Sequence, residues 1–221
     1  MALQLRDNLH WCDCDGRAVF LDVQADRYFC LPQTANDAFR RLAAGATQPE
    51  DIERLHALAA SGMLIEAGAG VAVPPPPRID PPTGDFVEDP KPRAGLLSIA
   101  RALASELRGA SLLRTKRFHA VIAAAQSRGQ RRESTVEPGR LVQEIVSASA
   151  ALSVVTRSHD RCLVRALAVH SVCRRSGIRT KLVFGVVAHP FTAHCWVQLG
   201  SAVLVGGYEQ ARLYTPILVI E

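Results

Sequence analysis

At 221 residues the chain is long enough for one large domain or two small ones. Its composition, 48% hydrophobic and 21% charged, is typical of a folded protein. It has no uninterrupted apolar run of about 18 residues, so we expect no membrane span. The net charge of +5 is uneven, because residues 1–75 contain six arginines against ten acidic residues. An acidic N-terminal region is poorly suited to a phosphate backbone, which argues against nucleic-acid binding.

The N-terminus lacks a basic start followed by an apolar stretch, so we expect no secretory signal and a cytoplasmic protein. Six cysteines in such a protein predict free thiols. His10, Cys12 and Cys14 fall on one face of a predicted strand near Cys30, and these residue types bind zinc. Strand alternation explains the same spacing and no Cys-x-x-Cys pair is present, so we predict no metal site and no cofactor.

Residues 1–70 are predicted to form a small winged-helix-like module. Three short strand-like segments come first, separated by turn residues. Two amphipathic helical segments follow, and a last short segment closes the module as a strand or a helix end. The expected strands are residues 9–14, 18–23 and 27–32, the expected helices are residues 36–45 and 49–62, and the closing segment is residues 63–67.

Residues 71–92 contain eight of the thirteen prolines, four of them consecutive from Pro74 to Pro77. Proline fixes φ and lacks an N–H group, so this stretch is predicted to stay outside sheets and helices as a semi-rigid spacer. It separates the N-terminal module from a second domain at residues 93–221.

The second domain is predicted to be α+β, with several helices followed by an antiparallel sheet. Residues 161–177 are apolar almost all round, which is typical of a helix buried in the centre of a domain. The arginines between Arg101 and Arg140 are best explained by a solvated helix face, and binding of acidic parts of a precursor peptide is the alternative. The other expected helices are residues 96–109, 112–129 and 137–155, and the expected strands are residues 180–188, 194–199, 202–206 and 215–221.

Cys162 and His194 are the candidate catalytic residues. A thiol becomes a nucleophile where its thiolate is stabilised and a base stands nearby. Ser158 or Asp160 is expected to cap the buried helix, so Cys162 lies in the first turn, where the helix dipole favours the thiolate. His194 begins a strand 32 residues later, and the intervening helix and strand can bring its imidazole to the helix start. Taken singly, each residue is equally explained by packing in a core.

The sequence around these two residues resembles the B protein of lasso-peptide biosynthesis, a papain-like, transglutaminase-like cysteine peptidase. The resemblance covers about residues 140–221, and the N-terminal module resembles the leader-recognition element of peptide-maturation proteins. It implies a peptidase that removes the leader of a lasso-peptide precursor, with Cys162 as nucleophile and His194 as general base. A separate ATP-dependent cyclase then closes the macrolactam. The segments that carry the resemblance are SHDRCLVRALAVHSVCRRSGIRTKLVFGV, FTAHCWVQLG and YTPILVIE.

The third member of the site departs from the family pattern. In the family an acid, usually Asp, lies about a dozen residues after the histidine and orients its ring. The expected hairpin places Gly206 or Gly207 opposite His194, and neither has a side chain. Glu209 is the nearest carboxylate, and it reaches the ring only if the strand bulges at the glycines. Otherwise a backbone carbonyl, Gln198 or water orients the ring.

Leader binding by strand addition requires an exposed sheet edge and side-chain pockets. The third strand and the second helix of the module are expected to form this groove. Tyr28, Leu31, Leu55 and Leu58 are the candidate contacts, and ordinary packing is the alternative for each. Trp196 is expected to form a wall of the catalytic cleft or to pack in the core.

Two other functions remain open. The chain is a non-catalytic adaptor that delivers the precursor to the cyclase if the glycine at the acid position disables the site. The chain is a winged-helix transcription regulator only if its acidic N-terminal module still binds DNA, which its charge disfavours.

Overall fold

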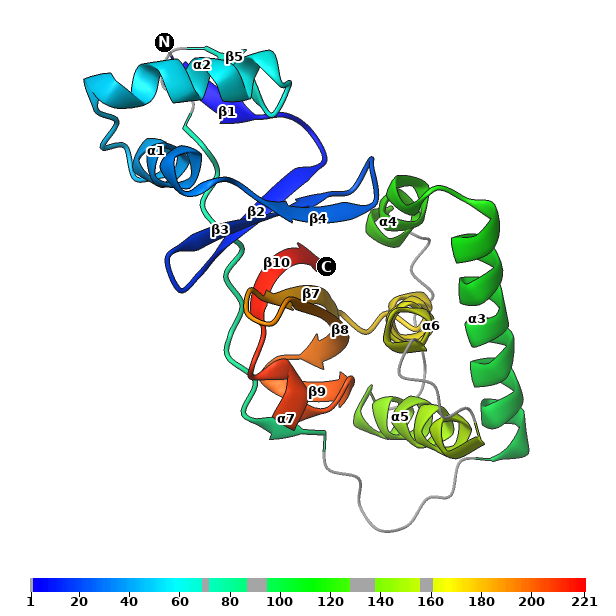
Figure 1. Ribbon diagram of the computed structural model, residues 1–221. Coiled ribbons are helices and arrows are strands. Elements are labelled where there is room, and N and C mark those ends of the chain that lie inside the picture. The colour runs from blue at the N-terminus through cyan, green and yellow to red at the C-terminus, as the bar shows by residue number, and fades with distance from the viewer. Residues whose placement is uncertain (1, 69–71, 87–94, 128–137, 156–160) are drawn as a thin grey trace. The chain divides into compact units, whose positions relative to one another are not determined.

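The computed structural model describes the chain except for residues 1, 69–71, 87–94, 128–137 and 156–160. The described part contains seven α-helices and three sheets, which confirms the expected α+β class (Figure 1). The chain divides into two compact units. The first consists of Met1–Arg78, Val186–Thr192 and Thr215–Leu218, and the second of Ile79–Gly185, Ala193–Tyr214 and Val219–Glu221.

The N-terminal module is built on a three-stranded antiparallel sheet with the order β2-β3-β4. These strands, β2 (Leu9–Cys14), β3 (Arg17–Asp22) and β4 (Arg27–Cys30), confirm the three expected from the sequence. A second antiparallel sheet pairs β1 (Ala2–Leu5) with β5 (Leu64–Ala67). The sequence pattern left β5 open between strand and helix and did not predict β1. The winged-helix assignment of this module stays a prediction.

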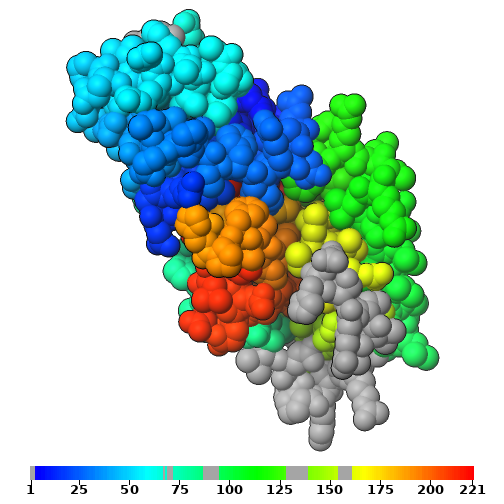
Figure 2. Space-filling model, in the orientation of Figure 1, coloured from blue at the N-terminus to red at the C-terminus, as the bar shows by residue number. Residues whose placement is uncertain are grey.

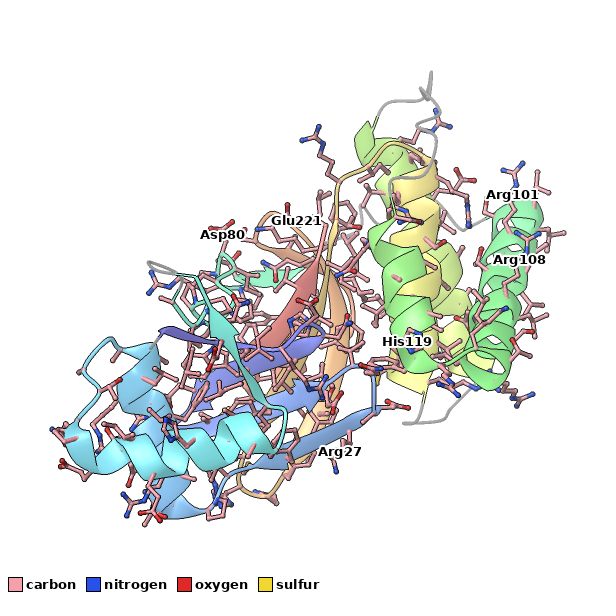
Figure 3. The ribbon with its side chains drawn as sticks, turned by 90° about the horizontal axis from the view of Figure 1, so that it is seen from above. Arg27, Asp80, Arg101, Arg108, His119 and Glu221 are labelled. Carbon is pink, nitrogen blue, oxygen red and sulfur yellow. The ribbon has the colours of Figure 1, made fainter. Side chains whose placement is uncertain are left out.

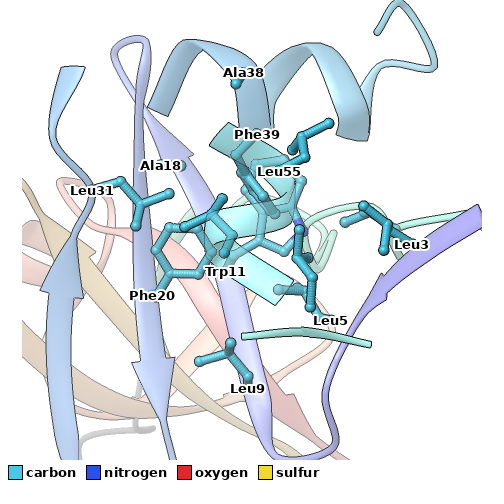
Figure 4. Packing of buried hydrophobic residues seen from close by; sticks show 13 residues of the cluster. Leu3, Leu5, Leu9, Trp11, Ala18, Phe20, Leu31, Ala38, Phe39 and Leu55 are labelled. Atoms are coloured by element: carbon cyan, nitrogen blue, oxygen red, sulfur yellow. The ribbon is translucent and has the colours of Figure 1, made fainter. Parts of the chain in front are cut away.

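An aromatic core lies between one face of this sheet and the two module helices, α1 (Gln33–Ala43) and α2 (Ile52–Ala60) (Figure 4). Trp11 and Phe20 are opposite each other in the β2–β3 register, so their side chains share a face. The Phe39 ring of α1 lies edge to face 5.0 Å from Trp11 and 4.9 Å from Phe20, measured between ring centroids. Such aromatic pairs contribute about 0.5–1.5 kcal/mol each beyond their buried area.

The second unit holds most of a five-stranded sheet with the order β10-β7-β8-β9-β6. Four of its strands are those expected from the C-terminal sequence. They are β7 (Lys181–Val187), β8 (Thr192–Leu199), β9 (Ala202–Val205) and β10 (Thr215–Ile220).

Helices cover one face of this sheet, and α6 (Cys162–Arg175) lies between the sheet and α3 (Leu96–Thr115) (Figure 1). The central position of α6 confirms the prediction made from its nearly all-round apolar sequence. The other helices of this layer are α4 (Phe118–Gln126) and α5 (Pro138–Val155). Among the helices that the structure describes, none has the length and apolar character needed to cross a membrane.

Part of the proline-rich segment joins the sheet, contrary to the prediction. The strand β6 (Gly84–Asp85) pairs in parallel with β9. The amides of Thr83 and Phe86 extend this pairing, donating to the carbonyls of Ser201 and Val203 over 2.9 and 2.8 Å. The prediction was wrong because the four paired residues contain no proline and keep their N–H groups, despite the prolines on either side.

The β8–β9 hairpin contains an irregularity that the sequence argument placed elsewhere. Leu199 pairs with Ala202 as expected. Val197, however, pairs with Val205 and not with Leu204, the partner that regular pairing predicts. The register shift lies between Val197 and Gln198. The extra residue is Leu204 of β9, because Val203 and Val205 pair with the consecutive residues Gln198 and Val197. The shift places Gly206 against Trp196, where an added Cβ would lie 2.5 Å from Trp196 Cβ, and not opposite Cys195 as the regular pairing predicts.

Candidate active site

The imidazole of His194 is half-buried on β8, on the strand face that also carries Trp196. The two rings are stacked, with centroids 6.1 Å apart and planes 19° apart. The Tyr214 ring lies 5.2 Å from the imidazole. Alternate residues of a strand share a face, which explains the pairing of His194 with Trp196 and directs Cys195 to the opposite face.

The backbone carbonyl of Gly206 holds the His194 ring. The ring Nε2 lies 2.8 Å from the Gly206 oxygen. A carbonyl only accepts hydrogen bonds, so Nε2 must carry the proton, and Nδ1 is the free base of the neutral ring. Burial lowers the pKa of His194, and the hydrogen bond to the Gly206 carbonyl offsets part of this effect.

No side chain fits at position 206. Gly206 has a φ of +111°, and a Cβ there would lie 2.5 Å from Trp196 Cβ and 3.2 Å from His194 Nε2. Gly185 is equally constrained, because its Cβ would lie 2.6 Å from the Trp196 ring. The position at which the family pattern expects an acid is therefore closed to a side chain by its positive φ and by Trp196.

Glu209 does not contact the His194 ring. It lies on α7 (Tyr208–Ala211), its side chain is 73% exposed, and its Oε2 is 2.7 Å from Nε of Arg212. The chain turns into this short helix directly after the glycine pair. A continuous strand was assumed in predicting that Glu209 could reach the ring, and the turn into α7 was not predicted.

Gln198 is also occupied elsewhere. It is fully buried, and its Nε2 donates to the carbonyls of Asp80 and Gly200 over 2.7 Å each. Its Oε1 accepts from the Trp196 indole N–H over 3.2 Å. Gln198 therefore fixes Trp196 and leaves the orientation of His194 to the Gly206 carbonyl.

Cys162 is the first residue of α6, as the sequence predicts, and its side chain is partly exposed. The candidate caps Ser158 and Asp160 lie outside the described residues. Burial first, and then the charge of Cys162, raise the pKa of the Cys195 thiol well above its ordinary value.

The two candidate catalytic groups lie in the same compact unit. Within the described part of the chain, no hydrogen bond joins the Cys162 sulfur to the His194 ring. Contacts of this kind are often long in a substrate-free enzyme and tighten when the substrate binds. The described structure thus has a thiol at the start of α6 and an imidazole oriented by a backbone carbonyl in the same unit.

Most of the expected substrate contacts are core residues. Leu31, Leu55 and Leu58 are buried in the aromatic core of the module. Trp196 is 1% exposed and packs in the core of the second unit, so it does not form an open wall of a cleft. Tyr28 keeps exposed surface, and its ring lies 5.5 Å from that of Phe191.

All six cysteines are free thiols, as predicted. The sulfur atoms of Cys12 and Cys14 lie 3.7 Å apart in the interior, and the hydrogen bond from Cys12 lowers the pKa of Cys14 to about 7. Across the described residues, no group of three or more His, Cys, Asp or Glu side chains is placed to hold a metal ion.

Comparison with protein families gives a match between residues 103–219 and the model of the transglutaminase-like superfamily. The match covers more than half of the chain and includes both Cys162 and His194. The chain belongs to the transglutaminase-like superfamily. This superfamily includes cysteine peptidases and acyltransferases, and the mixed α+β structure is consistent with a papain-like fold. Comparisons with curated proteins and with solved structures gave no match.

Proposed function

We propose that the chain is the leader peptidase of lasso-peptide maturation. The N-terminal module binds the leader, and the transglutaminase-like domain hydrolyses the leader–core amide bond. The observation that carries the proposal is the His194 ring, whose Nε2–H is fixed by the Gly206 carbonyl and whose Nδ1 is free to take a proton. An oriented imidazole and a thiol at a helix start, in a domain of this superfamily, are the groups that thiol acyl transfer requires.

In the proposed reaction, Nδ1 of His194 takes the proton of Cys162, and the sulfur attacks the scissile carbonyl. The backbone N–H of Cys162 lies in the first turn of α6, where amides have no partner inside the helix, and it donates to the oxyanion. The imidazolium protonates the leaving amine, which frees the core peptide with a new amino end. Water then hydrolyses the leader thioester and restores the thiol.

This reaction requires Cys162 and His194 to come within hydrogen-bond reach when the precursor binds. Gly206 remains the positioning residue throughout. Its carbonyl does for the ring what an acid does in a triad, but as a neutral acceptor it stabilises the imidazolium less than a carboxylate would.

The proposed leader site is the open edge of β4. Among the strands that the structure describes, β4 pairs with β3 alone and forms an edge of the three-stranded sheet, so an extended leader adds there as a fourth strand. Tyr28 lies on this strand and supplies a partly exposed ring. Holding the leader on the module raises the effective concentration of the cleavage site at the peptidase domain.

Leader release from the precursor, followed by mass spectrometry, tests the proposal. We expect Cys162→Ala to abolish release and to leave leader binding unchanged. Cys173→Ala is the matched control, because it removes a buried thiol of the same helix far from its start. Unchanged cleavage by Cys162→Ala would remove the peptidase assignment.

A second candidate function follows from Gly206 at the acid position and from the absence, among the described residues, of a hydrogen bond between Cys162 and His194. In this alternative the chain is an adaptor that presents the precursor to the cyclase without cutting it. An adaptor binds the leader but yields no free leader, with or without the cyclase, and the same mass spectrometry distinguishes the two.

A further inference from the structure

The helices of the second unit form a pocket of about 650 Å³ between α3, α5 and α6. The surfaces of α3 (green) and α6 (yellow) lie side by side in Figure 2, and both helices also pack on α5. The volume lies within the range of small-molecule sites, roughly 300–1,000 Å³. One face of each helix forms the wall, and on α3 this face consists of Ser98, Arg101, Ala102, Ser105 and Glu106.

Small side chains leave the space between the three helices open. Each helix contributes an alanine to the wall: Ala102 on α3, Ala148 on α5 and Ala168 on α6. An apolar wall with a few polar groups is typical of a site for an organic ligand. The apolar part of this wall is aliphatic and consists of Leu141, Ile145, Val169 and Val172.

The pocket has an acidic end and a basic end. At the acidic end, Glu144 of α5 accepts a hydrogen bond from the Ser98 hydroxyl of α3. At the basic end, Arg175 of α6 donates to the Ser105 hydroxyl of α3 over 3.3 Å. Ser98 and Ser105 are two turns apart on α3, which separates the two ends by roughly 10 Å.

Arg101 adds a second positive charge to the wall. It lies on α3 between the two serines, one turn from each (Figure 3). Burial first, and then the charges of Arg108 and Arg174, lower the pKa of Arg175, so like charges lie near this guanidinium. Within the described part of the chain, no ion pair involves Arg101, Arg175 or Glu144. These charges are therefore available to a ligand.

Two buried polar atoms of the wall also lack hydrogen bonds. Ser149 of α5 is 4% exposed, and its hydroxyl has no hydrogen-bond partner among the residues that the structure describes. Ser147 and Ser153, in contrast, donate to carbonyls of their own helix. Within the same described residues, Oε1 of Glu106 has no hydrogen bond either, although this carboxylate forms an ion pair with Arg165. Buried polar groups without partners are costly, so the wall favours a ligand that has polar groups of its own.

We propose that this pocket binds a short apolar peptide with free ends, about three residues long. The carboxylate of the peptide lies against Arg101 and Arg175, and its amino group lies against Glu144. Three extended residues span roughly 10 Å, which matches the separation of the two ends. The aliphatic wall covers the apolar side chains, and the Ser149 hydroxyl donates to a peptide carbonyl.

The pocket is separate from the candidate catalytic groups. The α6 part of its wall begins at Ala168, six residues after Cys162 and about 9 Å farther along the helix. His194 does not belong to the wall. The proposal therefore does not depend on the peptidase assignment.

Three tripeptides that differ only at their ends test the proposal. The probe is trileucine with both ends free. The controls are N-acetyl-trileucine, which lacks the positive charge, and trileucine amide, which lacks the negative charge. Isothermal titration calorimetry with the full chain measures binding. We expect trileucine to bind and each control to bind at least about tenfold more weakly, because one charged group of the pocket loses its partner.

Charge variants of the protein locate each end of the peptide. Arg101→Gln combined with Arg175→Gln should abolish the preference for the free carboxylate over the amide. Glu144→Gln should abolish the preference for the free amino group over the acetylated one. Arg114→Gln is the matched control, because Arg114 is an exposed arginine of α3 outside the wall, and it should leave all three affinities unchanged.

A change of volume tests the location without changing charge. Ala102→Leu should weaken the binding of trileucine by about tenfold or more, because the larger side chain occupies part of the pocket. Ala104→Leu is the matched control, since Ala104 is exposed on the same helix and outside the wall. Circular dichroism verifies that each variant folds.

Three results would overturn the proposal. The first is that trileucine at millimolar concentration does not bind to the folded parent chain. The second is that either capped peptide binds as tightly as trileucine, which would assign the pocket to a ligand with only one charge or with none. The third is binding that Ala102→Leu and the charge variants leave intact, which would place the peptide elsewhere on the chain.

Discussion

His194 and His170 both belong to the second unit, and burial is the first cause of the lowered pKa of each. Their surroundings nevertheless differ. His194 is half-buried, with Nε2 held by a carbonyl and Nδ1 left as a base. His170 is 2% exposed inside α6, its Nδ1 lies 3.0 Å from Oγ1 of Thr180, and burial and then Arg174 lower its pKa to about 4. The hydrogen-bond partner and the access to solvent, and not the residue type, distinguish a candidate base from a structural imidazole.

The largest expected effect is on leader cleavage. His194→Gln should reduce kcat/KM by about 10³-fold or more, because the general base is lost. His170→Gln should retain most of the activity, because its side chain lies within the core. Cleavage assays on both purified variants measure the difference. Equal losses in two folded variants would end the distinction between these histidines.

The next prediction concerns the contribution of Gly206, beside His194, to the stability of the fold. Gly206→Ala should lower the free energy of unfolding by about 4 kcal/mol, because the new Cβ overpacks Trp196 and the positive φ becomes strained. Gly200→Ala is the control: its φ is also positive, at +57°, but no atom lies within 4 Å of the added Cβ. It should cost only about 1 kcal/mol. Urea unfolding measures both, and similar losses would show that the fit against Trp196 contributes nothing.

The dependence of stability on pH tests His170. Its pKa is about 4 in the folded state and ordinarily 6.5, so below pH 6.5 the unfolded chain takes up the proton first. The contribution of neutral His170 is complete above pH 6.5 and is lost progressively down to about pH 4, by at most about 3 kcal/mol. His170→Gln should remove this part of the acid sensitivity. A variant with the same pH dependence as the parent chain would show that other groups cause it.

The smallest expected effect is in the pH profile of cleavage. In the proposed reaction the neutral form of His194 acts as the base. Burial lowers the pKa of His194, so the acidic limb of the profile should have its midpoint below pH 6.5. Tyr214→Ala exposes the ring and should move this limb upward by less than about one pH unit. His170→Gln should not move it. A limb above pH 6.5 in the parent chain would contradict the environment described for His194.

The periodicity of apolar residues was sufficient to predict most helices and strands of this fold. It succeeded for α6 because a helix that is apolar on all sides has no stable place except the interior. It failed for β6, because proline content describes a segment as a whole, whereas strand pairing needs only a few free N–H groups. It missed α7 because two consecutive glycines are compatible with a continuing strand as well as with a turn.

The sequence predicted less of the site than of the fold. The position of Cys162 at a helix start follows from local pattern, and so does the placement of His194 on a strand. A backbone carbonyl was one of the acceptors expected for the ring proton, but the sequence could not say which carbonyl, because every residue has one. The leucines proposed for the leader groove illustrate the same limit: Leu55 and Leu58 have the amphipathic spacing that either a groove or a core produces.

Hydrogen bonds hold the first half of the proline-rich segment at two points, Pro74 and Asp80. The indole N–H of Trp11 donates to the carbonyl of Pro74 over 2.8 Å, and Gln198 holds the carbonyl of Asp80 over 2.7 Å. Only residues 75–79 lie between these two hydrogen-bonded positions, and five extended residues span roughly 15 Å. Beyond Asp80, β6 is hydrogen-bonded to β9, the strand that ends just before Gly206. The same stretch of polypeptide thus connects the N-terminal module with the strand next to the residue whose carbonyl is hydrogen-bonded to the His194 imidazole.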